Sequence, residues 1–371
     1  MARVVLAMSG GVDSSVAAHL LQEQGHEVVG VFMRHGEESA ASCDLPGSSQ
    51  PGMLPLLNQR ADHKQGCCSA SDAADARRVA DRLGIPFYAL NLQADFRRIV
   101  DYFVDEYSEG RTPNPCVMCN NWLKFGRLFD YADGIQAEYV ATGHYAQLMT
   151  PADASGPALC QGVDTSKDQS YVLFGIDRNY LQRMLLPVGG YTKPQIRALA
   201  GDIGLRVADK KDSQEICFVT SGKHDEFVRA RREEDLSGEI VTTTGEVVGH
   251  HPGIERFTIG QRKGLGVALG EPRFVVAINK ERRQVVIGEK SALARTRLTA
   301  NRTNWLLDPP RGRFRCTAKI RYNSPPADAY GELGEDGKLD VEFDEPRYGV
   351  APGQAVVCYD DQRVLGGGWI E

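Results

Sequence analysis

The stretch that decides the fold is SGGVDSS at residues 9–15, which lies between an apolar run and an amphipathic segment. Residues 3–8 are apolar with β-branched side chains, which predicts a buried strand that glycine ends. Residues 14–24 place apolar side chains on one face and stop at Gly25, which predicts a helix. Residues 27–34 (EVVGVFMR) predict the next strand, so the segment is a βαβ unit with parallel strands and a right-handed crossover.

The composition of the loop at residues 9–15 favours an anion. Its glycines let the backbone approach a ligand closely, and the N–H groups at the start of the following helix attract negative charge. The loop lacks the lysine of a Walker A motif, so transfer of a γ-phosphate is not its natural chemistry. Asp13 would repel phosphates unless it holds Mg²⁺ or orients the loop. A tight turn with a helix cap is the structural alternative.

The pattern along the chain predicts three domains. Strands and helices alternate through residues 1–206, which predicts a Rossmann-like α/β domain with a parallel sheet. Residues 36–66 are rich in Ser, Gly, Pro and Gln without a period, which predicts a long surface loop insertion. Residues 207–272 predict a small mixed central domain. Residues 273–371 carry strand after strand between turn residues, which predicts a C-terminal antiparallel β-barrel.

Composition limits the class of protein and its partners. The 371 residues are 42% hydrophobic and 25% charged, as in ordinary soluble domains. No run approaches the ~18–20 apolar residues of a membrane span, so we expect a cytoplasmic protein without a membrane partner. The net charge is -6, yet residues 256–321 hold 16 Lys and Arg against four Asp and Glu. This asymmetry predicts a basic face for a polyanion, and a solvated surface with scattered salt bridges is the alternative.

Three of the nine cysteines are expected to be core residues. Cys160, Cys316 and Cys358 lie in strand-like runs, where a thiol packs as a small hydrophobic side chain. A framework of structural disulfides is not expected in a cytoplasmic chain.

Two other segments carry cysteines beside polar residues. Cys116 and Cys119 form a CxxC motif in RTPNPCVMCN (residues 111–120), whose two prolines predict a non-helical loop. Cys217 lies in KDSQEICF. A structural zinc site usually needs four ligands, and no second close cysteine pair lies near Cys217. Catalytic cysteines are therefore favoured, and inert ones are the alternative.

The motifs together resemble a known family. SGGVDSS resembles the pyrophosphate-binding loop of the PP-loop ATP pyrophosphatases, which cleave ATP between its α and β phosphates and adenylate a carbonyl oxygen. RTPNPxxxCN, ATGHY, KDQSY, KKDSxxICF, GQRKGLG and a final LGGG follow in order. With these motifs the chain resembles the bacterial tRNA 2-thiouridylases of the MnmA type from residue 8 to residue 368.

The resemblance implies ATP and Mg²⁺ as cofactors, and it implies three sets of site residues. The catalytic residues would be Asp13, Cys119 as the nucleophile and Cys217 as the persulfide carrier. The nucleotide would be bound by Ala7, Met8, Ser9, Gly10, Gly11, Val12, Asp13, Ser14, Met33 and Gly143. The target base would be met by Asn114, Pro115 and Cys116, and tRNA would be contacted by Lys167, Asp168, Gln169, Arg321 and Tyr322.

The implied reaction is ATP-dependent 2-thiolation of the wobble uridine of tRNA. Adenylation of the uridine 2-oxygen makes AMP the leaving group, and sulfur arrives on Cys217 from a relay protein or a cysteine desulfurase. Either a disulfide between Cys119 and Cys217 or a hydrosulfide made with the help of Cys119 would result. The family points to the tRNAs for Lys, Glu and Gln.

Two other functions are considered. A PP-loop ligase or amidotransferase acting on a small metabolite would explain SGGVDSS but would leave the cysteines and the basic segment unused. A nucleotide-sensing or RNA-binding protein without catalysis would need no paired cysteines.

The sequence departs from the family at two places. Residues 36–66 are longer than usual, and Cys116 stands where many members have aspartate. With Cys119 and Cys217, the additional thiol gives three possible ligands for a 4Fe–4S cluster with an open fourth iron. A metal-free Cys119–Cys217 pair, with Cys116 as a bystander, is the prediction that we favour.

Overall fold

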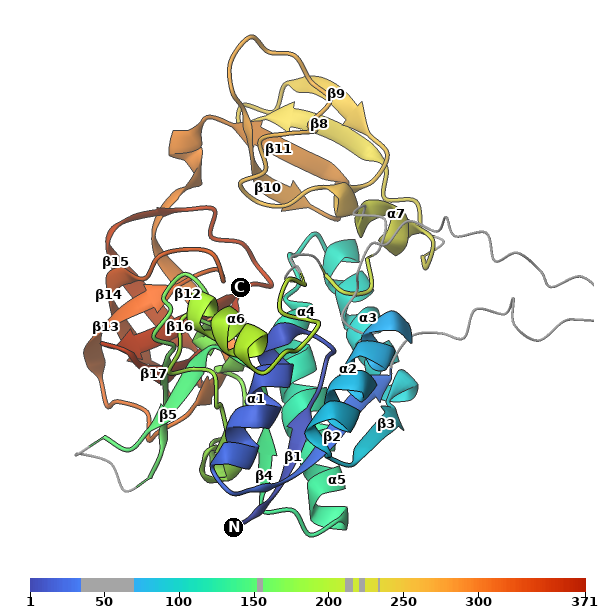
Figure 1. Ribbon diagram of the computed structural model, residues 1–371. Helices are drawn as coiled ribbons and strands as arrows, with labels where there is room; N and C mark the ends of the chain where they lie inside the picture. The colour runs from blue at the N-terminus through green and yellow to red at the C-terminus, as the bar shows by residue number, and fades with distance from the viewer. Residues whose placement is uncertain (35–69, 152–155, 211–215, 220–223, 233) are drawn as a thin grey trace, which may run out of the picture.

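The protein consists of three parts that follow one another along the chain (Figure 1). A parallel sheet with its helices comes first, a four-stranded sheet follows, and a barrel ends the chain. The computed structural model describes residues 1–34, 70–151, 156–210, 216–219, 224–232 and 234–371. The insertion predicted at residues 36–66 lies outside the described residues.

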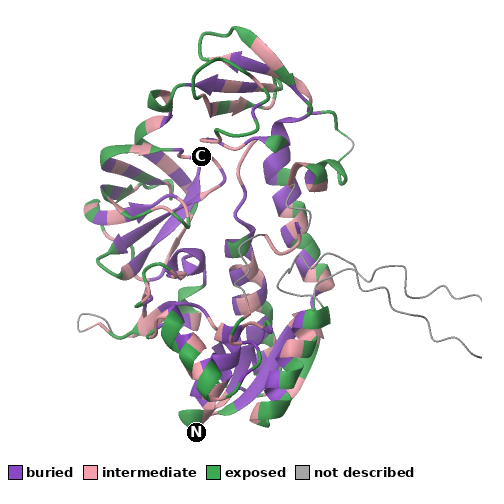
Figure 2. Ribbon diagram, turned by 45° about the horizontal axis from the view of Figure 1, so that its top comes forward, coloured by how far each residue is buried: buried purple, intermediate pink, exposed green. Residues whose placement is uncertain are grey.

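The N-terminal sheet has the strand order β3-β2-β1-β4-β7, and all its pairings are parallel. The central strand β1 is apolar after Arg3, and Val4, Val5 and Leu6 are fully buried. Figure 2 shows this sheet buried between its covering helices. The Rossmann-like α/β prediction is thereby confirmed. The strands are β1 (Arg3–Ala7), β2 (Glu27–Arg34), β3 (Phe87–Asn91), β4 (Tyr139–Ala141) and β7 (Met184–Leu185).

Helices connect these strands or, in the case of α6, follow the last of them. Their apolar faces pack on the sheet, as the periodicity of the sequence predicts. The helices are α1 (Val12–Glu23), α2 (Ala70–Leu83), α3 (Gln93–Ser108), α5 (Leu128–Gly134) and α6 (Lys193–Asp202), with short 3₁₀ turns η3 (Ser170–Leu173) and η4 (Arg178–Arg183).

The CxxC segment is helical, so the prediction of a non-helical loop was wrong. Helix α4 (Pro115–Met118) leads directly into a π-helical stretch, η2 (Cys119–Arg127). Asn114 caps α4, because its side chain accepts a hydrogen bond from the N–H of Val117 at 3.4 Å. Proline is compatible with the first turn of a helix, where its missing N–H has no partner to lose. Cys119 therefore lies at the junction of two helix types, a kind of irregularity frequent at functional sites.

The middle part is a mixed sheet with the order β10-β11-β8-β9, in which only β11 and β8 are parallel. The strands that start at residues 274 and 284 were expected in the barrel, but both pair within this sheet. The expected boundary at residue 273 thus falls inside it, because a strand's sequence does not reveal its partner. The elements are α7 (His224–Arg229), β8 (Gly238–Thr242), β9 (Val247–His251), η5 (Ile254–Arg256), β10 (Phe274–Asn279) and β11 (Gln284–Gly288).

The C-terminal part is an antiparallel barrel that is closed by pairing between β12 and β17. It confirms the predicted barrel, and Cys316 and Cys358 are buried in its core as expected. After the turn η6 (Lys290–Leu293), the barrel strands are β12 (Ala294–Trp305), β13 (Arg313–Lys319), β14 (Ala327–Leu333), β15 (Leu339–Tyr348), β16 (Ala355–Asp360) and β17 (Arg363–Ile370).

The first and last parts share structure. A hairpin of the N-terminal part, β5 (Ala146–Met149) and β6 (Ala158–Gln161), extends the barrel sheet at β17 and buries Cys160. The Tyr171 hydroxyl donates to the Ala355 carbonyl at 2.9 Å. One hydrophobic core cluster includes side chains from both parts. The two therefore pack as a continuous body. Among the described helices, none is long and apolar enough to cross a membrane.

Candidate active site

The loop after β1 is shaped by its glycines. Gly10 has φ +72°, and a Cβ there would lie 2.2 Å from the carbonyl oxygen of Asp72, so no other residue fits without a shift. Gly11 is the N-cap of α1 and offers no side chain to its first turn. The Ser14 hydroxyl lies 3.2 Å from both the N–H of Ser9 and the carbonyl of Gly11, which curls the loop. This turn and the start of α1 form a cradle that suits the pyrophosphate of ATP.

Asp13, in the first turn of α1, is held by two other segments. Lys193 Nζ donates to both carboxylate oxygens at 2.8 Å, and the Tyr145 hydroxyl donates to Oδ1 at 2.7 Å. Lys193 is 7% exposed. Of the two roles considered for Asp13, these contacts favour orientation of the loop, because both oxygens already bind a cation.

Lys210 is the second lysine at the loop. Its Nζ donates to the Gly10 carbonyl at 3.0 Å and to the carboxylates of Asp72 and Asp75 at 2.7 Å each. Burial lowers the pKa of Lys210, but the hydrogen bonds that its amine donates to the two carboxylates outweigh burial, so its pKa is raised. Arg197 of α6 holds the backbone at Lys210, because its guanidinium donates a hydrogen bond to the Lys210 carbonyl at 3.0 Å.

The Ala141-Thr142-Gly143-His144 segment lies against the loop from the other side. A Cβ on Gly143 would lie 2.8 Å from the backbone nitrogen of Ser14. His144 is buried, with Nδ1 2.7 Å from Thr142 Oγ1 and Nε2 3.3 Å from Lys124 Nζ. Burial, with Lys124 adding to it, lowers the pKa of His144 well below 6.5. The ring is therefore neutral, and it accepts a hydrogen bond from Lys124 at Nε2.

Helix α3 supports both segments that contain the expected catalytic cysteines. Cys119 and Cys217 are each half-buried, and both pack against the core cluster that includes Ala7 at the end of β1. Phe218 packs edge-on against Phe96 and Phe103 of α3, with ring centroids 5.5 and 5.1 Å apart. Cys119 and Cys217 are thus placed around the same core as the start of the nucleotide loop.

The arrangement of Cys116, Cys119 and Cys217 does not fit the iron–sulfur cluster considered from the sequence. Cys116 is exposed, whereas Cys119 and Cys217 are half-buried. Within the described ranges, no three His, Cys, Asp or Glu side chains gather as a metal ion requires. Cys116, Cys119 and Cys217 all belong to those ranges, so they do not form the three-thiolate site that a cluster would need.

Of the residues expected at tRNA, some face inward. Asp168 is buried and accepts hydrogen bonds from the N–H groups of Gly162 and Ser170, both at 3.1 Å. Gln169 accepts from the Tyr145 N–H at 2.9 Å and donates its own N–H to the Tyr145 carbonyl at 2.8 Å. Asp168 and Gln169 thereby stabilise the segment that presents Tyr145 to Asp13.

The other expected contacts differ in exposure. Asn114 and Pro115 are buried at the start of α4, and Cys116 is exposed beside them. Lys167 is half-buried, and Tyr322 is 36% exposed. Cys116, Lys167 and Tyr322 are therefore accessible enough to meet a nucleic acid.

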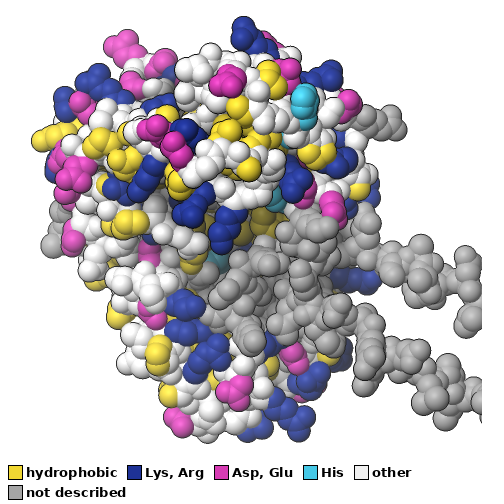
Figure 3. Space-filling model, turned by 90° about the horizontal axis from the view of Figure 1, so that it is seen from above, with side chains coloured by type: hydrophobic (Ala, Val, Ile, Leu, Met, Phe, Trp, Pro, Cys, Tyr) yellow, Lys and Arg dark blue, Asp and Glu magenta, His cyan; other side chains and the backbone are white. Residues whose placement is uncertain are grey.

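Acidic partners neutralise part of the basic segment at residues 256–321. Figure 3 shows Lys and Arg side chains interspersed with Asp and Glu on the face seen from above. Six of the 16 cations at residues 256–321 form ion pairs, namely Arg273, Lys280, Arg297, Arg313, Arg315 and Lys319. The scattered-salt-bridge alternative accounts for these six.

An aromatic row, Trp122, Tyr102 and Trp369, runs from η2 to the barrel. The Tyr102 ring lies 6.3 Å from that of Trp122 and 6.1 Å from that of Trp369, and its hydroxyl accepts the N–H of Asn114 at 3.3 Å. Exposed arginines cover both ends: Arg98 lies 4.0 Å from the Trp122 centroid and Arg302 5.4 Å from the Trp369 centroid. Arg302 has φ +45°. Sequence reasoning missed this row, because its members come from three distant segments.

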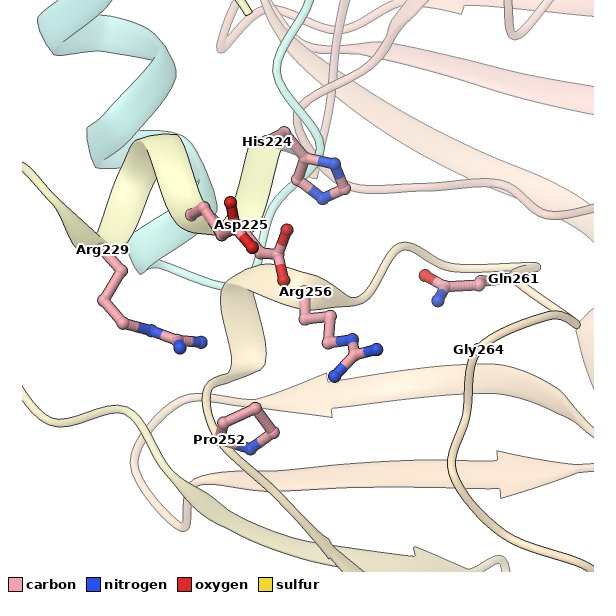
Figure 4. A pocket seen from close by; sticks show the side chains of 8 residues that line it. His224, Asp225, Arg229, Pro252, Arg256, Gln261 and Gly264 are labelled. Atoms are coloured by element: carbon pink, nitrogen blue, oxygen red, sulfur yellow. The ribbon is translucent and has the colours of Figure 1, made fainter. Parts of the chain in front are cut away.

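A surface pocket of about 420 Å³ lies between α7 and the middle sheet. Figure 4 shows Asp225 and Arg229 reaching it from α7, with Arg256 from η5 and Gln261 opposite. Arg229 is paired with the buried Glu255 at 3.0 Å. None of the residues predicted for catalysis, nucleotide or tRNA lines this pocket, and its charges are balanced.

The fold and the loop define a class: a PP-loop ATP-binding domain followed by a mixed sheet and a closed barrel. The family described as "tRNA methyl transferase HUP domain" matches residues 2–221. The families described as "tRNA methyl transferase PRC-barrel domain" and "Aminomethyltransferase beta-barrel domain" match residues 225–289 and 295–370.

Curated relatives identify the family within that class. The chain is 59% identical to a tRNA-specific 2-thiouridylase MnmA from Rhodopirellula baltica, across 100% of this chain and 96% of the relative. It is 47% identical to the protein of the same name from Carboxydothermus hydrogenoformans, across 100% and 97%. The chain belongs to the family of the tRNA-specific 2-thiouridylases.

Among solved structures, a 4-thiouridine synthetase–RNA complex with bound ATP matches 60% of this chain and 46% of that chain, with a TM-score of 0.37 and 16% identity. This similarity is too low to inform the site.

Proposed function

We propose that this protein uses ATP and a cysteine persulfide to replace the 2-oxygen of the wobble uridine of tRNA by sulfur. Family membership supports the reaction class, and the placement of Cys119, Cys217 and the nucleotide loop around one core cluster is the observation that carries the proposal. The family descriptions mention methyl transfer, whereas the relatives' names specify thiolation. An ATP cradle and two cysteine segments that pack against α3 fit thiolation better.

The first step is adenylation. The uridine 2-oxygen attacks the α-phosphate of ATP, and pyrophosphate leaves. The cradle at residues 9–15 would hold the phosphates, and Mg²⁺ would neutralise them in part. Gly143 allows the neighbouring segment to approach the loop closely, and Met33 of β2 packs near the end of β1. We infer that Ala7, Met8, Ser9, Gly10, Gly11, Val12, Ser14, Met33 and Gly143 surround the nucleotide.

The second step is sulfur transfer. Cys217 carries a persulfide whose terminal sulfur bonds to carbon 2 of the base while AMP leaves with the oxygen. The Cys119 thiolate attacks the inner sulfur, so the S–S bond of the persulfide breaks and a Cys119–Cys217 disulfide forms. In the alternative order, attack by Cys119 first releases hydrosulfide, which then adds to the base. A dithiol or a similar reductant must restore the two thiols in either case.

The partners follow from this chemistry. We propose that tRNAs for Lys, Glu and Gln are the substrates and that a sulfur-relay protein or cysteine desulfurase loads Cys217. Cys116, Lys167 and Tyr322 are the accessible residues expected to contact tRNA, and Asn114 and Pro115 shape the turn beside the target base. Cytoplasmic tRNA would be the pool that is used.

The test is nucleoside mass analysis of tRNA from cells that lack the gene, complemented by wild type, Cys119→Ser or Cys217→Ser. We expect 2-thiouridine only with wild type. Purified cysteine variants should still form AMP from ATP in the presence of bulk tRNA, since adenylation precedes sulfur transfer. Unchanged 2-thiouridine in the deletion strain would refute the proposal, and AMP formation that needs a small metabolite instead of tRNA would favour the ligase alternative.

A further inference from the structure

Lys193 occupies a position that local helix chemistry disfavours. It is the first residue of α6, where the positive end of the helix dipole prefers an acidic side chain. Its amine is also almost completely buried, which is costly for a charge without a partner. The N-terminus of α6 is already well formed without it, because the Thr192 N–H donates to Gln195 Oε1 at 2.8 Å and Pro194 fits the first turn. Because a lysine at this position is disfavoured both by the helix dipole and by burial, we expect its role to lie outside its own helix.

That role is visible at Asp13. The carboxylate lies in the first turn of α1, beside the N–H groups that would receive phosphate, where an uncompensated negative charge would repel the ligand. Lys193 cancels this charge, and Tyr145 fixes the orientation of the carboxylate from a third segment. The Lys193 amine also lies 5.6 Å from the centroid of the Tyr145 ring, so the three groups form one packed cluster.

Lys210 holds the same loop at a different atom. It binds the Gly10 carbonyl, and its two carboxylate partners come from α2. Without Lys210, the Gly10 carbonyl oxygen, which carries a partial negative charge, would have no cation beside it in the loop that is to receive phosphate. Arg197, one helical turn after Lys193 on α6, binds the backbone at Lys210. The two lysines are therefore connected through α6.

We propose that Lys193 and Lys210 are positioning residues of the nucleotide loop, which act through Asp13 and through the Gly10 carbonyl. This inference rests on the proposed use of ATP and concerns how the loop is kept ready for an anion. Lys193 removes the repulsion that Asp13 would exert, and Lys210 turns the Gly10 carbonyl toward α2. Neither amine needs to contact the nucleotide.

A charge-compensation experiment separates this role from direct phosphate binding. The dissociation constant of Mg-ATP is measured by equilibrium binding without tRNA for wild type, Lys193→Met, Asp13→Asn and the double variant. Lys193→Met should weaken ATP binding by on the order of tenfold or more, because it exposes the Asp13 charge. The double variant should bind ATP better than Lys193→Met alone, because the repelling charge is gone as well. If Lys193 binds phosphate directly, the double variant will bind no better than Lys193→Met, and the proposal for Lys193 fails.

Lys210 is tested in the same assay with Lys210→Met and Lys210→Arg. Methionine should weaken ATP binding severalfold, and arginine should restore most of the loss, because a cation can still bridge Asp72 and the Gly10 carbonyl. Equal ATP affinity in Lys210→Met and wild type would overturn the assignment for Lys210.

Lys338→Met is the matched control, since it breaks an exposed ion pair with Glu371 on the barrel and should leave ATP binding unchanged. Circular dichroism of each variant checks folding. If a lysine-to-methionine variant does not fold, the same lysine is changed to glutamine instead. Because binding is measured without tRNA, the result stands even if another molecule proves to be the acceptor. A wild type that binds no Mg-ATP would refute the proposed function itself.

Discussion

The guanidinium of Arg321, two residues after β13, donates hydrogen bonds to the carbonyl of Ile259 at 2.8 Å and to that of Gly349. It thereby connects the barrel to the segment that leads into the middle sheet. The resemblance placed Arg321 at tRNA, yet both of these bonds are internal. Burial lowers the pKa of Arg321, as expected for a guanidinium enclosed by backbone. These two bonds give Arg321 a structural role in joining two domains, and its contact with tRNA stays a prediction.

Arg321→Ala should lower the free energy of unfolding by about 1–3 kcal/mol, because two carbonyl groups lose a charged donor. Denaturant titration measures this loss. The dependence of tRNA affinity on salt should keep the wild-type slope. A log–log slope that becomes shallower by about 0.7 to 0.9 would instead show that Arg321 binds a phosphate.

The aromatic row suggests a different pair of tRNA contacts. Arg98 and Arg302 are exposed at its two ends, close to the segment that contains Cys119, and Arg302 adopts a strained backbone conformation of a kind common at functional sites. Arg98→Ala and Arg302→Ala should each weaken tRNA binding and make the salt slope shallower by about 0.7. ATP binding should not change.

Arg297→Ala is the control for this pair, because Arg297 is exposed and paired with Glu342 at 2.9 Å on the outside of the barrel. It should leave the salt slope as in wild type. Equal slopes for all four proteins would show that the row only joins the two domains.

Sequence reasoning was most successful where the pattern is local. The βαβ unit around residues 9–15 follows from one strand, one glycine loop and one helix, and the structure has all three. The start of α4 was not predicted, because a proline such as Pro115 normally indicates the end of a helix. Only the structure shows that Asn114 caps the helix that begins at Pro115. The sheet joined by β10 was missed as well, because pairing depends on contacts far along the chain.

The candidate site shows the same limit. The Asp13–Lys193 pair joins residues 180 positions apart, so no window of sequence could contain it. A lysine at the first position of a predicted helix was a visible signal, since acids are usual there. The inward orientation of Asp168 had no such signal, because an acidic residue in a polar motif normally predicts exposure.

Cys116 should not be needed for activity. It is exposed in the first turn of α4 and is not gathered with Cys119 and Cys217 as a cluster ligand would be. Cys116→Ala and Cys116→Asp should retain 2-thiouridine formation within about threefold of wild type, whereas Cys119→Ser should abolish it. Formation is followed by nucleoside mass analysis after anaerobic purification. A loss of more than about 100-fold in Cys116→Ala would show that a third thiol takes part.

The last prediction concerns acid stability and the buried His144. Its pKa in the folded protein is well below 6.5, because burial and the neighbouring Lys124 both disfavour the charged ring. The unfolded chain binds a proton at this residue near pH 6.5, while the folded chain does not. The contribution of neutral His144 to stability is therefore complete above about pH 6.5 and is lost as the pH falls below that value. The loss approaches about 1.4 kcal/mol per pH unit for this group.

His144→Asn should make the fall in unfolding free energy between pH 6.5 and 5 less steep by up to that amount. Denaturant titrations at several pH values measure the slope. The fall should not vanish, because burial also lowers the pKa of His224 and of His251. If His144→Asn and wild type lose stability in parallel, His144 takes up a proton in the folded protein, and its bond to Lys124 cannot be the one described above.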